Sequence, residues 1–459
     1  MMNRSNTKKH SKADTIKSGL FFRNALRILK NPIEFLSQSV KNNGPVIKLN
    51  LAGKKYFMVQ HPEYVKHVLV DHSKIYNKTG YKIVRAFVGD ALVTSNGAGW
   101  VKKRRTISPV FHHQKLEGMV EAMNEEITLF LERIGNAGET GAINITDELR
   151  LLTMSIISRT MFNTTLEEMD HIVETLEELR NYSTRWMKSL VKIPTHWSTP
   201  VNRRYRKNTR IFDEIIYRII NKRKTSRADP SNPKHNDLLD MLLDHQDDET
   251  GSPMPDETVH DELTAMLIGG HETTTQILSW ALYQLAKNKE ILFKVRSESD
   301  VVMGGHLSTY ETISKLAYSR QVVYETLRFY PSFWVLSRKN IEDDNLNGFH
   351  VPSGSDVLIS VYGLHHHPAY WHNPDIFDPA HFDPSSDEKR HPYVFIPFGV
   401  APRLCIGQNF AMLEMLIIVN RIARTFDLEV PTGYVPKIEP DTTLRATGGI
   451  LLKAKKLKH

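Results

Sequence analysis

Apolar residues recur at intervals of three and four positions through the middle of the chain, from about residue 100 to residue 290. This spacing puts them on one face of a helix, so it predicts a mainly helical body. The pattern is strongest over 256–287 and, near the C-terminus, over 408–426. The apolar face of the second segment consists of Phe410, Leu413, Leu416, Ile417 and Ile422.

The first seventy residues show shorter and more varied patterns. A helix is predicted over residues 20–45, where Asn-Asn-Gly-Pro ends it. Two strands follow at 46–51 and 55–59, joined at Ala52-Gly53, and then a short helix at 63–70.

Three other stretches lack a long helical period. Residues 71–97 contain several glycines and read as a long irregular loop, a type of segment that is usually functional. Residues 226–236 read as a surface linker because of Asp229-Pro-Ser-Asn-Pro233. After residue 340, short strands are predicted, including 354–362 and 443–453. The whole pattern predicts a mainly α protein with a smaller β region.

Composition places the chain among ordinary globular proteins. Of its 459 residues, 40% are hydrophobic and 24% are charged, and no repeat or linker divides it. No window approaches the ~18–20 consecutive apolar residues of a membrane-spanning helix. Residues 1–19 are polar and lysine-rich without an apolar core, so they are no secretory signal. We therefore expect a disordered basic tail over 1–19 and one domain over 20–459.

The net charge of +8 indicates an acidic partner. Nucleic acid is the alternative, but no zinc-finger, helix-turn-helix or RNA-binding pattern supports it. The basic runs at 102–105 and 453–456 are also explained as solvated faces.

The only cysteine, Cys405, lies in the sequence Phe398-Gly-Val-Ala-Pro-Arg-Leu-Cys-Ile-Gly407. A single cysteine cannot form a disulfide within the chain, and it is consistent with a reducing cytosol. Glycines at 399 and 407 permit close backbone approach, and the helix predicted after Gly407 favours a thiolate. The planar, positively charged guanidinium of Arg403 is suited to bind a carboxylate. A buried, inert cysteine is the plain alternative.

This segment resembles the proximal haem-binding loop of the cytochrome P450 family. The resemblance implies the family's fold, a single large domain that is mainly α, with haem b buried between two helices. It implies that Cys405 is the iron ligand and that Phe398, Arg403 and Gly407 contact the haem. One position departs from the family, since Ala401 stands where glycine is usual. If the backbone there is left-handed, alanine costs about 1–2 kcal/mol.

A second segment, 263–275, carries Gly269, Gly270, Glu272 and Thr273 in the middle of a predicted helix. Glycine costs up to ~1 kcal/mol in a helix interior, and such a conflict is typical of a functional site. An acid next to an alcohol can relay protons. The segment matches the family's oxygen-activation motif, which implies proton delivery by Glu272 and Thr273. A crossing of two helices at small residues is the alternative.

Glu325 and Arg328 are spaced i,i+3 on a predicted helix. By the resemblance, this pair is buried and braces the segment before the haem loop. In the family a third residue, normally arginine, joins this pair to form a structural lock. Here the matching residue is His381, whose charge depends on pH.

Trp100 and Arg104, spaced i,i+4, and Arg338 match haem-propionate donors of the family. Ordinary packing or a surface charge explains each of them singly.

Histidines at 365–367 and 372 suggest a metal site, but consecutive residues point in different directions and nothing completes a ligand set.

The resemblance implies a monooxygenase that inserts one atom of O2 into a hydrophobic molecule of the fatty acid, terpenoid or carotenoid type. Electrons come from NAD(P)H through separate proteins, and we expect an acidic ferredoxin or flavodoxin with its reductase, docked at Lys102, Lys103 and Arg105. We expect a cytoplasmic monomer of the soluble bacterial type. The family positions of the substrate pocket are Ile83, Ala86, Phe87, Ala265, Gly269, Phe333, Trp334, Val335, Leu336, Thr447 and Ile450.

Two alternatives stay open within the haem-thiolate class. A peroxide-driven hydroxylase often lacks the acid–alcohol pair, which is present here. A non-catalytic sensor or ligand-binding protein needs the cysteine but not the proton relay.

Overall fold

The computed structural model of the protein describes residues 14–15, 31–42, 44–51, 54–80, 82–138, 141–169, 171–189, 193–232, 234–247, 250–346, 348–386 and 389–458. The chain forms two compact units. Unit 1 comprises residues 1–80, 333–376 and 387–404, and unit 2 comprises residues 81–332, 377–386 and 405–459. Each unit therefore combines segments that are far apart in the sequence.

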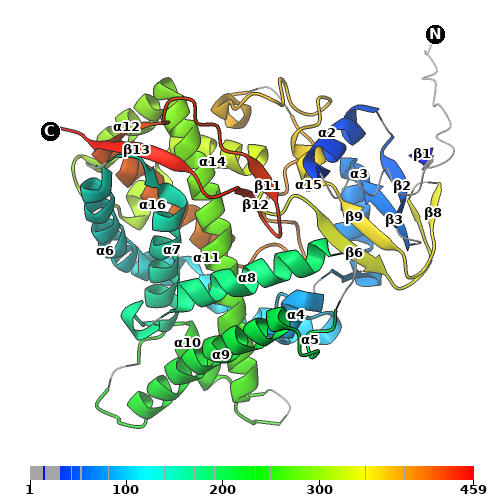
Figure 1. The fold of residues 1–459 in the computed structure, drawn as a ribbon, viewed down its shortest axis with the longest axis horizontal. Helices are drawn as coiled ribbons and strands as arrows, with labels where there is room; N and C mark the ends of the chain where they lie inside the picture. The colour runs from blue at the N-terminus through cyan, green and yellow to red at the C-terminus, as the bar shows by residue number, and fades with distance from the viewer. Residues whose placement is uncertain are drawn as a thin grey trace. The chain divides into compact units, whose positions relative to one another are not determined.

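Unit 1 is built on a six-stranded mixed sheet (Figure 1). In spatial order its strands are β1 (Asp14–Thr15), β2 (Val46–Leu51), β3 (Lys54–Val59), β9 (Asp356–Ile359), β6 (Leu336–Asn340) and β4 (Tyr76–Lys78). The strands predicted at 46–51 and 55–59 are confirmed as an antiparallel pair. Phe57, Val59, Val357 and Ile359 are buried and form the core beside the sheet.

Short helices and one hairpin complete unit 1. They are α2 (Pro32–Asn42), α3 (Pro62–Lys66), a π-helical turn (His67–Asp71), a 3-10 turn (Ser73–Ile75), α15 (Val361–His365) and the hairpin of β7 (Asp344–Leu346) and β8 (Phe349–Val351). The helix predicted over 20–45 covers 32–42, while residues 20–30 lie outside the described residues. The helix predicted over 63–70 starts at Pro62 but changes to π-helical geometry at His67.

Unit 2 is mainly helical, as predicted. Its longer helices are α5 (Gly97–Ile107), α6 (His113–Gly138), α7 (Ile145–Phe162), α8 (Ile172–Lys188), α9 (Pro200–Arg227), α11 (Asp256–Lys287), α12 (Lys289–Met303), α14 (Ala317–Phe329) and α16 (Gln408–Thr425). Its short elements are α4 (Lys82–Val88), α10 (Leu238–Asp244), α13 (Tyr310–Ser314), β5 (Ile143–Asn144), β10 (Phe426–Glu429), β11 (Ile438–Pro440), β12 (Leu444–Ala446) and β13 (Leu451–Lys456), together with 3-10 turns at Ser108–Phe111, Glu167–Met169 and Pro379–Phe382.

The helix α11 runs without a break through Gly269 and Gly270 (Figure 1). Its C-terminal half is buried on every side, including Ile277, Leu278 and Trp280. A helix that is apolar all round belongs in the middle of a large core. Tertiary packing of this helix therefore outweighs the weak helix preference of the two glycines.

The prediction of an irregular loop over 71–97 is wrong in part, because β4 and α4 lie within it. The helix α4 has only seven residues, and glycines with positive φ, Gly80 and Gly89, stand on either side of it. Two turns between such glycines are too short to display a helical period.

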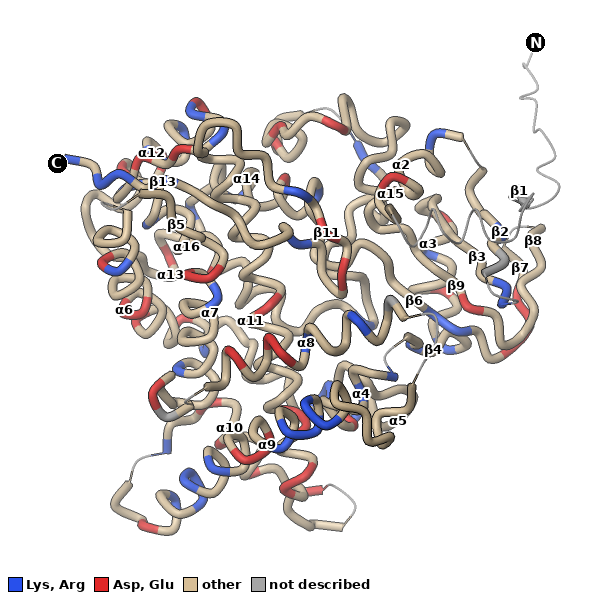
Figure 2. Tube along the Cα trace, in the orientation of Figure 1, with Lys and Arg blue, Asp and Glu red and all other residues tan. Residues whose placement is uncertain are grey.

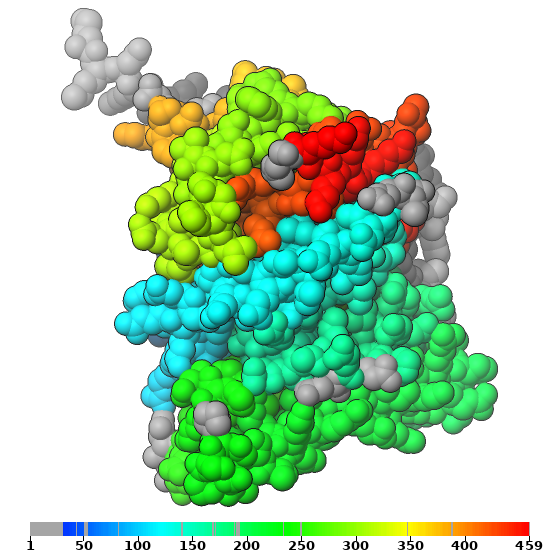
Figure 3. Space-filling model, turned by 90° about the vertical axis from the view of Figure 1, so that its left-hand side faces the viewer, coloured from blue at the N-terminus to red at the C-terminus, as the bar shows by residue number. Residues whose placement is uncertain are grey.

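The surface of unit 2 has two further features. Lysine and arginine are spread along α9 (Figure 2), which was not among the predicted basic runs. On another face, α6 lies beside α13 and β13 (Figure 3). Among the described residues, no helix is both long enough and apolar enough to cross a membrane.

The predicted tail, residues 1–19, lies outside the described residues except for Asp14 and Thr15. These two residues form β1, which pairs in parallel with Ile47 and Lys48 of β2.

Candidate functional site

Cys405 lies in unit 2, three residues before the first residue of α16. Its side chain is exposed. The N-cap of α16 is Gly407, so the unpaired amides of the first turn begin just after the cysteine. The positive end of a helix favours the thiolate form of a nearby cysteine. The fold thus presents an accessible sulfur at a site that stabilises its negative charge.

Arg104 of α5 is in electrostatic contact with this sulfur. Burial lowers the pKa of the Arg104 guanidinium, and the attraction of the Cys405 thiolate opposes that shift. Trp100 lies one turn earlier on α5 and is half-buried, as Arg104 is. After α5 the chain leads to Phe111, which is the nearest neighbour of Gly407. Two of the predicted propionate donors therefore lie on one face of a helix whose arginine interacts with the predicted ligand.

The turn before the cysteine belongs to unit 1 up to Leu404. Gly399 has φ +71°, a conformation that requires glycine. Among the described residues, the non-glycine residues with positive φ are Asn163, His171, Asn236 and Asn373. Ala401 is not one of them, so the strain expected for alanine in a left-handed turn does not arise.

The other predicted haem contacts also belong to unit 1. Arg338 lies in β6 opposite Lys78 of β4, is 8% exposed, and donates a hydrogen bond from Nη1 to the carbonyl of Ser337. Phe398 and Arg403 are half-buried residues of the loop before Cys405.

The two glycines in α11 have different surroundings. A Cβ atom on Gly270 would lie 2.2 Å from Cδ1 of Ile157, so α7 packs directly against this position. A Cβ atom on Gly269 would meet nothing within 4 Å, and Gly269 is exposed in the middle of a helix that is otherwise largely buried. Gly270 thus serves the helix crossing, and Gly269 opens the surface of α11.

Thr273 is linked to that opening. Its hydroxyl donates to the carbonyl of Gly269 at 2.6 Å, a bond of the kind that bends helices. The carbonyl of Thr273 accepts a hydrogen bond from Ser332 Oγ at 3.4 Å. The predicted hydroxyl therefore lies at the open turn and is not buried in a helix interface.

Glu272 is surrounded by neutral donors and by more distant charges. Thr443 Oγ1 and Gln276 Nε2 each donate to Glu272 Oε1 at 3.3 Å. Burial raises the pKa of this carboxyl above its ordinary value, and Arg180 and Arg150 oppose the shift. The carboxyl therefore holds a proton to higher pH than an exposed glutamate, as a proton relay requires.

The neighbouring His271 is 3% exposed, and its Nδ1 lies 3.0 Å from Thr153 Oγ1. Burial lowers the pKa of His271 to about 3, so the ring is neutral at physiological pH.

Glu325 and Arg328 of α14 form a fully buried ion pair, each with 0% exposed side-chain surface. Arg328 donates from Nε to Glu325 Oε2 and from Nη2 to Glu325 Oε1, both at 2.7 Å. The carboxylate also accepts from the amide of Asp378 at 2.8 Å, and His381 Nδ1 lies 3.2 Å away. The three predicted lock residues are in contact, with histidine in the place of the usual arginine.

The predicted pocket residues of unit 2 differ in accessibility. Val88, Ala91 and Ala265 form a small buried cluster, with Phe87 and Ile268 packed against it. Ala265 is one turn before Gly269 on α11, so this apolar surface borders the open turn. Ala86 and Thr447 are exposed.

Two predicted pocket residues are excluded from open space in this structure. Ile83 is 2% exposed and Ile450 is 0% exposed. The backbone of Ile450 is bonded to Ile145 and to the hydroxyl of Thr146, so its side chain is held within the core. In unit 1, Phe333 is 37% exposed, and Trp334, Val335 and Leu336 are half-buried.

The predicted docking run on α5 is partly neutralised within the protein. Lys102 forms an ion pair with Asp247. Lys103 is only 16% exposed and pairs with Asp90 at 3.3 Å and Glu262 at 3.6 Å. Lys103 links the loop after α4 to α11, and docking of a partner at this run stays a prediction.

The consecutive histidines have separate roles in unit 1. His365 is fully buried, and its Nε2 accepts from the amide of Ile396 at 3.0 Å. The His366 ring stacks on Tyr362, and Nδ1 of His367 accepts from the amide of Ala369. The rejection of a metal site at this run agrees with these separate contacts.

Sequence reasoning missed Thr443, Ser332 and the amide of Asp378. They reach Glu272, Thr273 and Glu325 from segments 171, 59 and 53 residues away. Short-range spacing carries no signal for such contacts.

These residues fit a haem-thiolate centre. The donor set offers a thiolate beside a helix N-terminus and a guanidinium, and the open turn at Gly269 leaves room for a flat group against α11. The class defined by the fold and the site is therefore that of a haem-thiolate protein.

Comparisons with known proteins extend this assignment. The Cytochrome P450 family profile matches residues 16–459. Cyclooctatin synthase of Streptomyces melanosporofaciens is 30% identical over 436 residues, which cover 93% of this chain and 92% of that protein. Cyclooctat-9-en-7-ol 5-monooxygenase of the same organism is 29% identical (89% and 87% covered), and human cytochrome P450 4F3 is 30% identical (86% and 80% covered). The chain belongs to the cytochrome P450 family.

Membership settles the reaction class and the cofactor. The protein is a cytochrome P450 monooxygenase that uses haem b, O2 and reducing equivalents from NAD(P)H that arrive through partner proteins. The mainly α fold with a smaller β region agrees with this family.

Proposed function

We propose that the protein hydroxylates a hydrophobic small molecule of the fatty acid, terpenoid or carotenoid type. The observation that carries this proposal is the apolar cluster around Ala265, whose partly buried members Phe87 and Ile268 leave apolar surface next to the exposed turn of α11 at Gly269. Apolar walls next to an opening suit an apolar ligand. Two relatives are named for cyclooctatin chemistry, and this also supports the choice of an apolar substrate.

In this proposal the haem, when bound, supplies the activation of O2 for insertion into a C–H bond. Cys405 is the thiolate ligand, kept ionised by the N-terminus of α16 and by Arg104. Trp100, Arg104, Arg338 and Arg403 bind the propionates, while Phe398 and Gly407 shape the ligand loop. Glu325, Arg328 and His381 brace the segment before that loop.

Glu272 and Thr273 deliver protons in this scheme. Burial raises the pKa of Glu272, so its carboxyl keeps a proton to higher pH than an exposed glutamate does, and Thr443 and Gln276 fix the carboxyl in place. Thr273 lies next in sequence, with its hydroxyl directed to the open turn. The pair can pass a proton from the interior to that turn.

Substrate class is tested by optical titration of the haem-loaded enzyme against panels of fatty acids, terpenoids and carotenoids. The expected result is a spin-state shift with one panel, followed by a product 16 mass units heavier. Ala265→Phe fills the apolar surface and is expected to weaken that shift at least about 10-fold. Ala228→Phe, at the exposed C-cap of α9, is the matched control. A shift of equal affinity in Ala265→Phe contradicts the proposed pocket.

The electron source distinguishes the O2-dependent enzyme from the two alternatives, a peroxide-driven hydroxylase and a non-catalytic sensor. Substrate-dependent NADPH oxidation with a surrogate ferredoxin system supports the O2-dependent enzyme. Product from hydrogen peroxide alone indicates a peroxide-driven hydroxylase, and binding without product under either condition indicates a sensor. Cys405→Ser is expected to lose the thiolate type of carbon monoxide spectrum, and its retention would refute the assignment of the ligand.

We infer that an acidic ferredoxin or flavodoxin delivers the electrons. Arg105 is an exposed cation of the predicted run, whereas Lys103 is largely covered. His112 and His113 are also exposed on the segment that follows α5. Arg105→Ala is expected to slow reduction at low salt and to have no effect at high salt, because screening removes the steering. Lys102→Ala is the control, and equal slowing by both variants contradicts docking at Arg105.

A further inference from the structure

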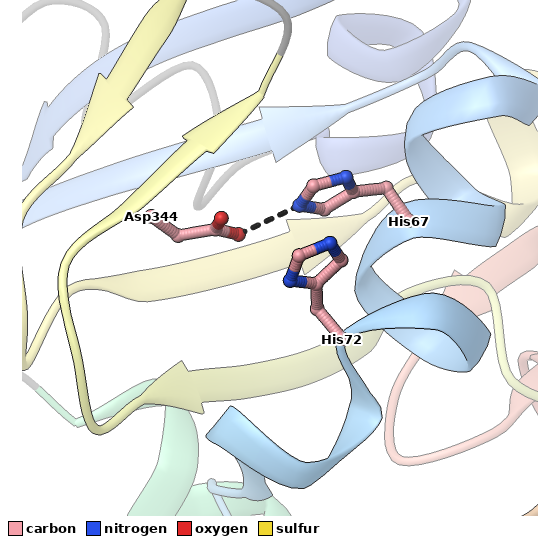
Figure 4. A group of neighbouring side chains, drawn as sticks. All are labelled: His67, His72 and Asp344. Atoms are coloured by element: carbon pink, nitrogen blue, oxygen red, sulfur yellow. Dashed lines mark hydrogen bonds and ion pairs between the residues drawn. The ribbon is translucent and has the colours of Figure 1, made fainter.

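His67, His72 and Asp344 form a compact cluster in unit 1 that the haem chemistry does not use (Figure 4). One ligand atom from each residue lies within 4.8 Å of the other two. His67 and Asp344 are half-buried, and His72 is exposed. The two histidines come from the π-helical turn His67–Asp71 and the residue after it, and Asp344 begins β7.

The π-helical turn is what brings the two imidazoles together. In an α-helix, residues five apart point about 140° away from each other. Here the amide of His72 donates to the carbonyl of His67 at 2.9 Å, the i to i+5 bond that defines a π turn. The wider turn aligns both side chains, so the rings stack with centroids 3.9 Å apart and 12° between their planes. Single π turns within helices occur frequently at functional sites.

The carboxylate of Asp344 is held in a fixed orientation beside the imidazoles. His67 Nε2 lies 2.9 Å from Asp344 Oδ2, and Tyr76 Oη donates to the same oxygen at 2.5 Å. The amide of Asn345 donates to Oδ1 at 2.8 Å. Such outer hydrogen bonds orient the ligands of metal sites.

We propose that His67, His72 and Asp344 bind one divalent transition-metal ion of the zinc type, with water in the remaining position. Two imidazoles and a carboxylate suit zinc, nickel or copper, whereas calcium and magnesium need a shell of oxygen atoms. With bonds of about 2.0–2.1 Å, two ligands of a tetrahedral ion lie about 3.3 Å apart. The present 2.9 Å between His67 and Asp344 needs an opening of only a few tenths of an ångström.

His72 completes the site by rotation of its side chain. It is exposed, and in Figure 4 its ring lies beside that of His67, with one ring nitrogen on the side of Asp344. The bound ion replaces the stack of two imidazoles by two metal bonds. It also joins the π-helical turn to β7, segments that are 277 residues apart in the chain. An ion that binds only this arrangement stabilises unit 1 by mass action.

The test uses haem-loaded enzyme, freed of adventitious metal by a chelator and titrated with zinc chloride in competition with a chromogenic chelator. Wild type is expected to bind one zinc ion that His72→Ala binds at least about 10-fold more weakly, since even loss of an outer partner has that effect. Zinc is expected to raise the melting temperature of wild type and not of His72→Ala. Magnesium chloride is the negative probe.

Because the chain has 21 histidines, a matched control is essential. His350 is exposed on β8, opposite Asn345, and is not part of the cluster. His350→Ala is expected to bind zinc as wild type does. Equal affinity in wild type and His72→Ala refutes the site, and so does an anomalous zinc peak in crystals that lies away from the three residues. Asp344→Asn provides a second variant and is expected to weaken zinc in the same way.

Discussion

Glu272 and Glu325 are glutamates of unit 2 with opposite surroundings. Glu325 is completely buried, and Arg328 holds it with two charge-assisted hydrogen bonds of 2.7 Å. Glu272 is half-buried, and its hydrogen-bond donors are the neutral Thr443 and Gln276 at 3.3 Å. The first arrangement fixes a charge permanently, because a bidentate guanidinium satisfies it. The second lets a carboxyl gain and lose a proton, which structural bracing does not require.

Removal of Arg328 is expected to have the largest effect on stability. Arg328→Met leaves Glu325 as a buried charge without its partner, and we expect a loss of about 3–5 kcal/mol of stability, seen as a large fall in melting temperature and in holoprotein yield. Arg204→Met, which removes an ion pair whose arginine is 70% exposed, is the control and is expected to change stability by at most about 1 kcal/mol. Similar effects of the two substitutions would contradict the role of burial.

A third carboxylate, Glu262 of α11, makes the stability of the protein depend on pH. It is 1% exposed, accepts from the amide of Leu92 at 3.0 Å, and has Lys103 3.6 Å away. Burial raises its pKa to about 7. The folded protein therefore holds this proton more tightly than the unfolded chain, so stability falls as pH rises from about 4.5 to 7, by about 3 kcal/mol in total.

Glu262→Gln removes this contribution, and the melting temperature of the variant relative to wild type is expected to rise between pH 4.5 and 7. Parallel curves for the two proteins would show that Glu262 does not carry the shift. His260, whose pKa is raised to about 9 through Asp213 and Asp261 against its burial, loses its stabilisation only above pH 6.5. The two groups are thus separable by the pH range in which they act.

Glu272→Gln tests whether this carboxyl delivers protons during turnover. The amide keeps a hydrogen-bonding oxygen for Thr443 but has no proton to give, so we expect product formation to fall about 100-fold with little change in melting temperature. Glu257→Gln, at an exposed position on the same helix, is the control. An unchanged turnover rate in Glu272→Gln would remove this residue from the proton path.

The smallest effect is expected at the histidine of the lock. His381→Ala removes one of the contacts of Glu325, and we expect a loss of about 1 kcal/mol, since Arg328 and the amide of Asp378 remain. His381→Arg, the residue usual in the family, is expected to equal or exceed wild type in melting temperature. A fall as large as that of Arg328→Met would mean that His381 carries an equal share of the lock.

Sequence reasoning succeeded where a pattern is local or a motif is specific. The bounds of α11 and α16 followed from helical periodicity, and the contact between Glu325, Arg328 and His381 from the resemblance to the family. It failed for α4, which is too short to show a period, and it could not show the acidic partners of Lys103, which lie 13 and 159 residues away. It named a crossing of two helices only as an alternative and could not assign it to Gly270, because the position of Ile157 on another helix decides this. Contacts between distant segments decide each of these cases.

The difference between Gly269 and Gly270 has a practical meaning for laboratory evolution of this enzyme. Side chains introduced at position 269 enter the space that the proposal gives to the haem and the substrate, so they are expected to change haem binding and selectivity more than stability. A side chain at 270 must move the end of Ile157 instead. A mutational scan of this helix should therefore find loss of function at one position and loss of stability at the next.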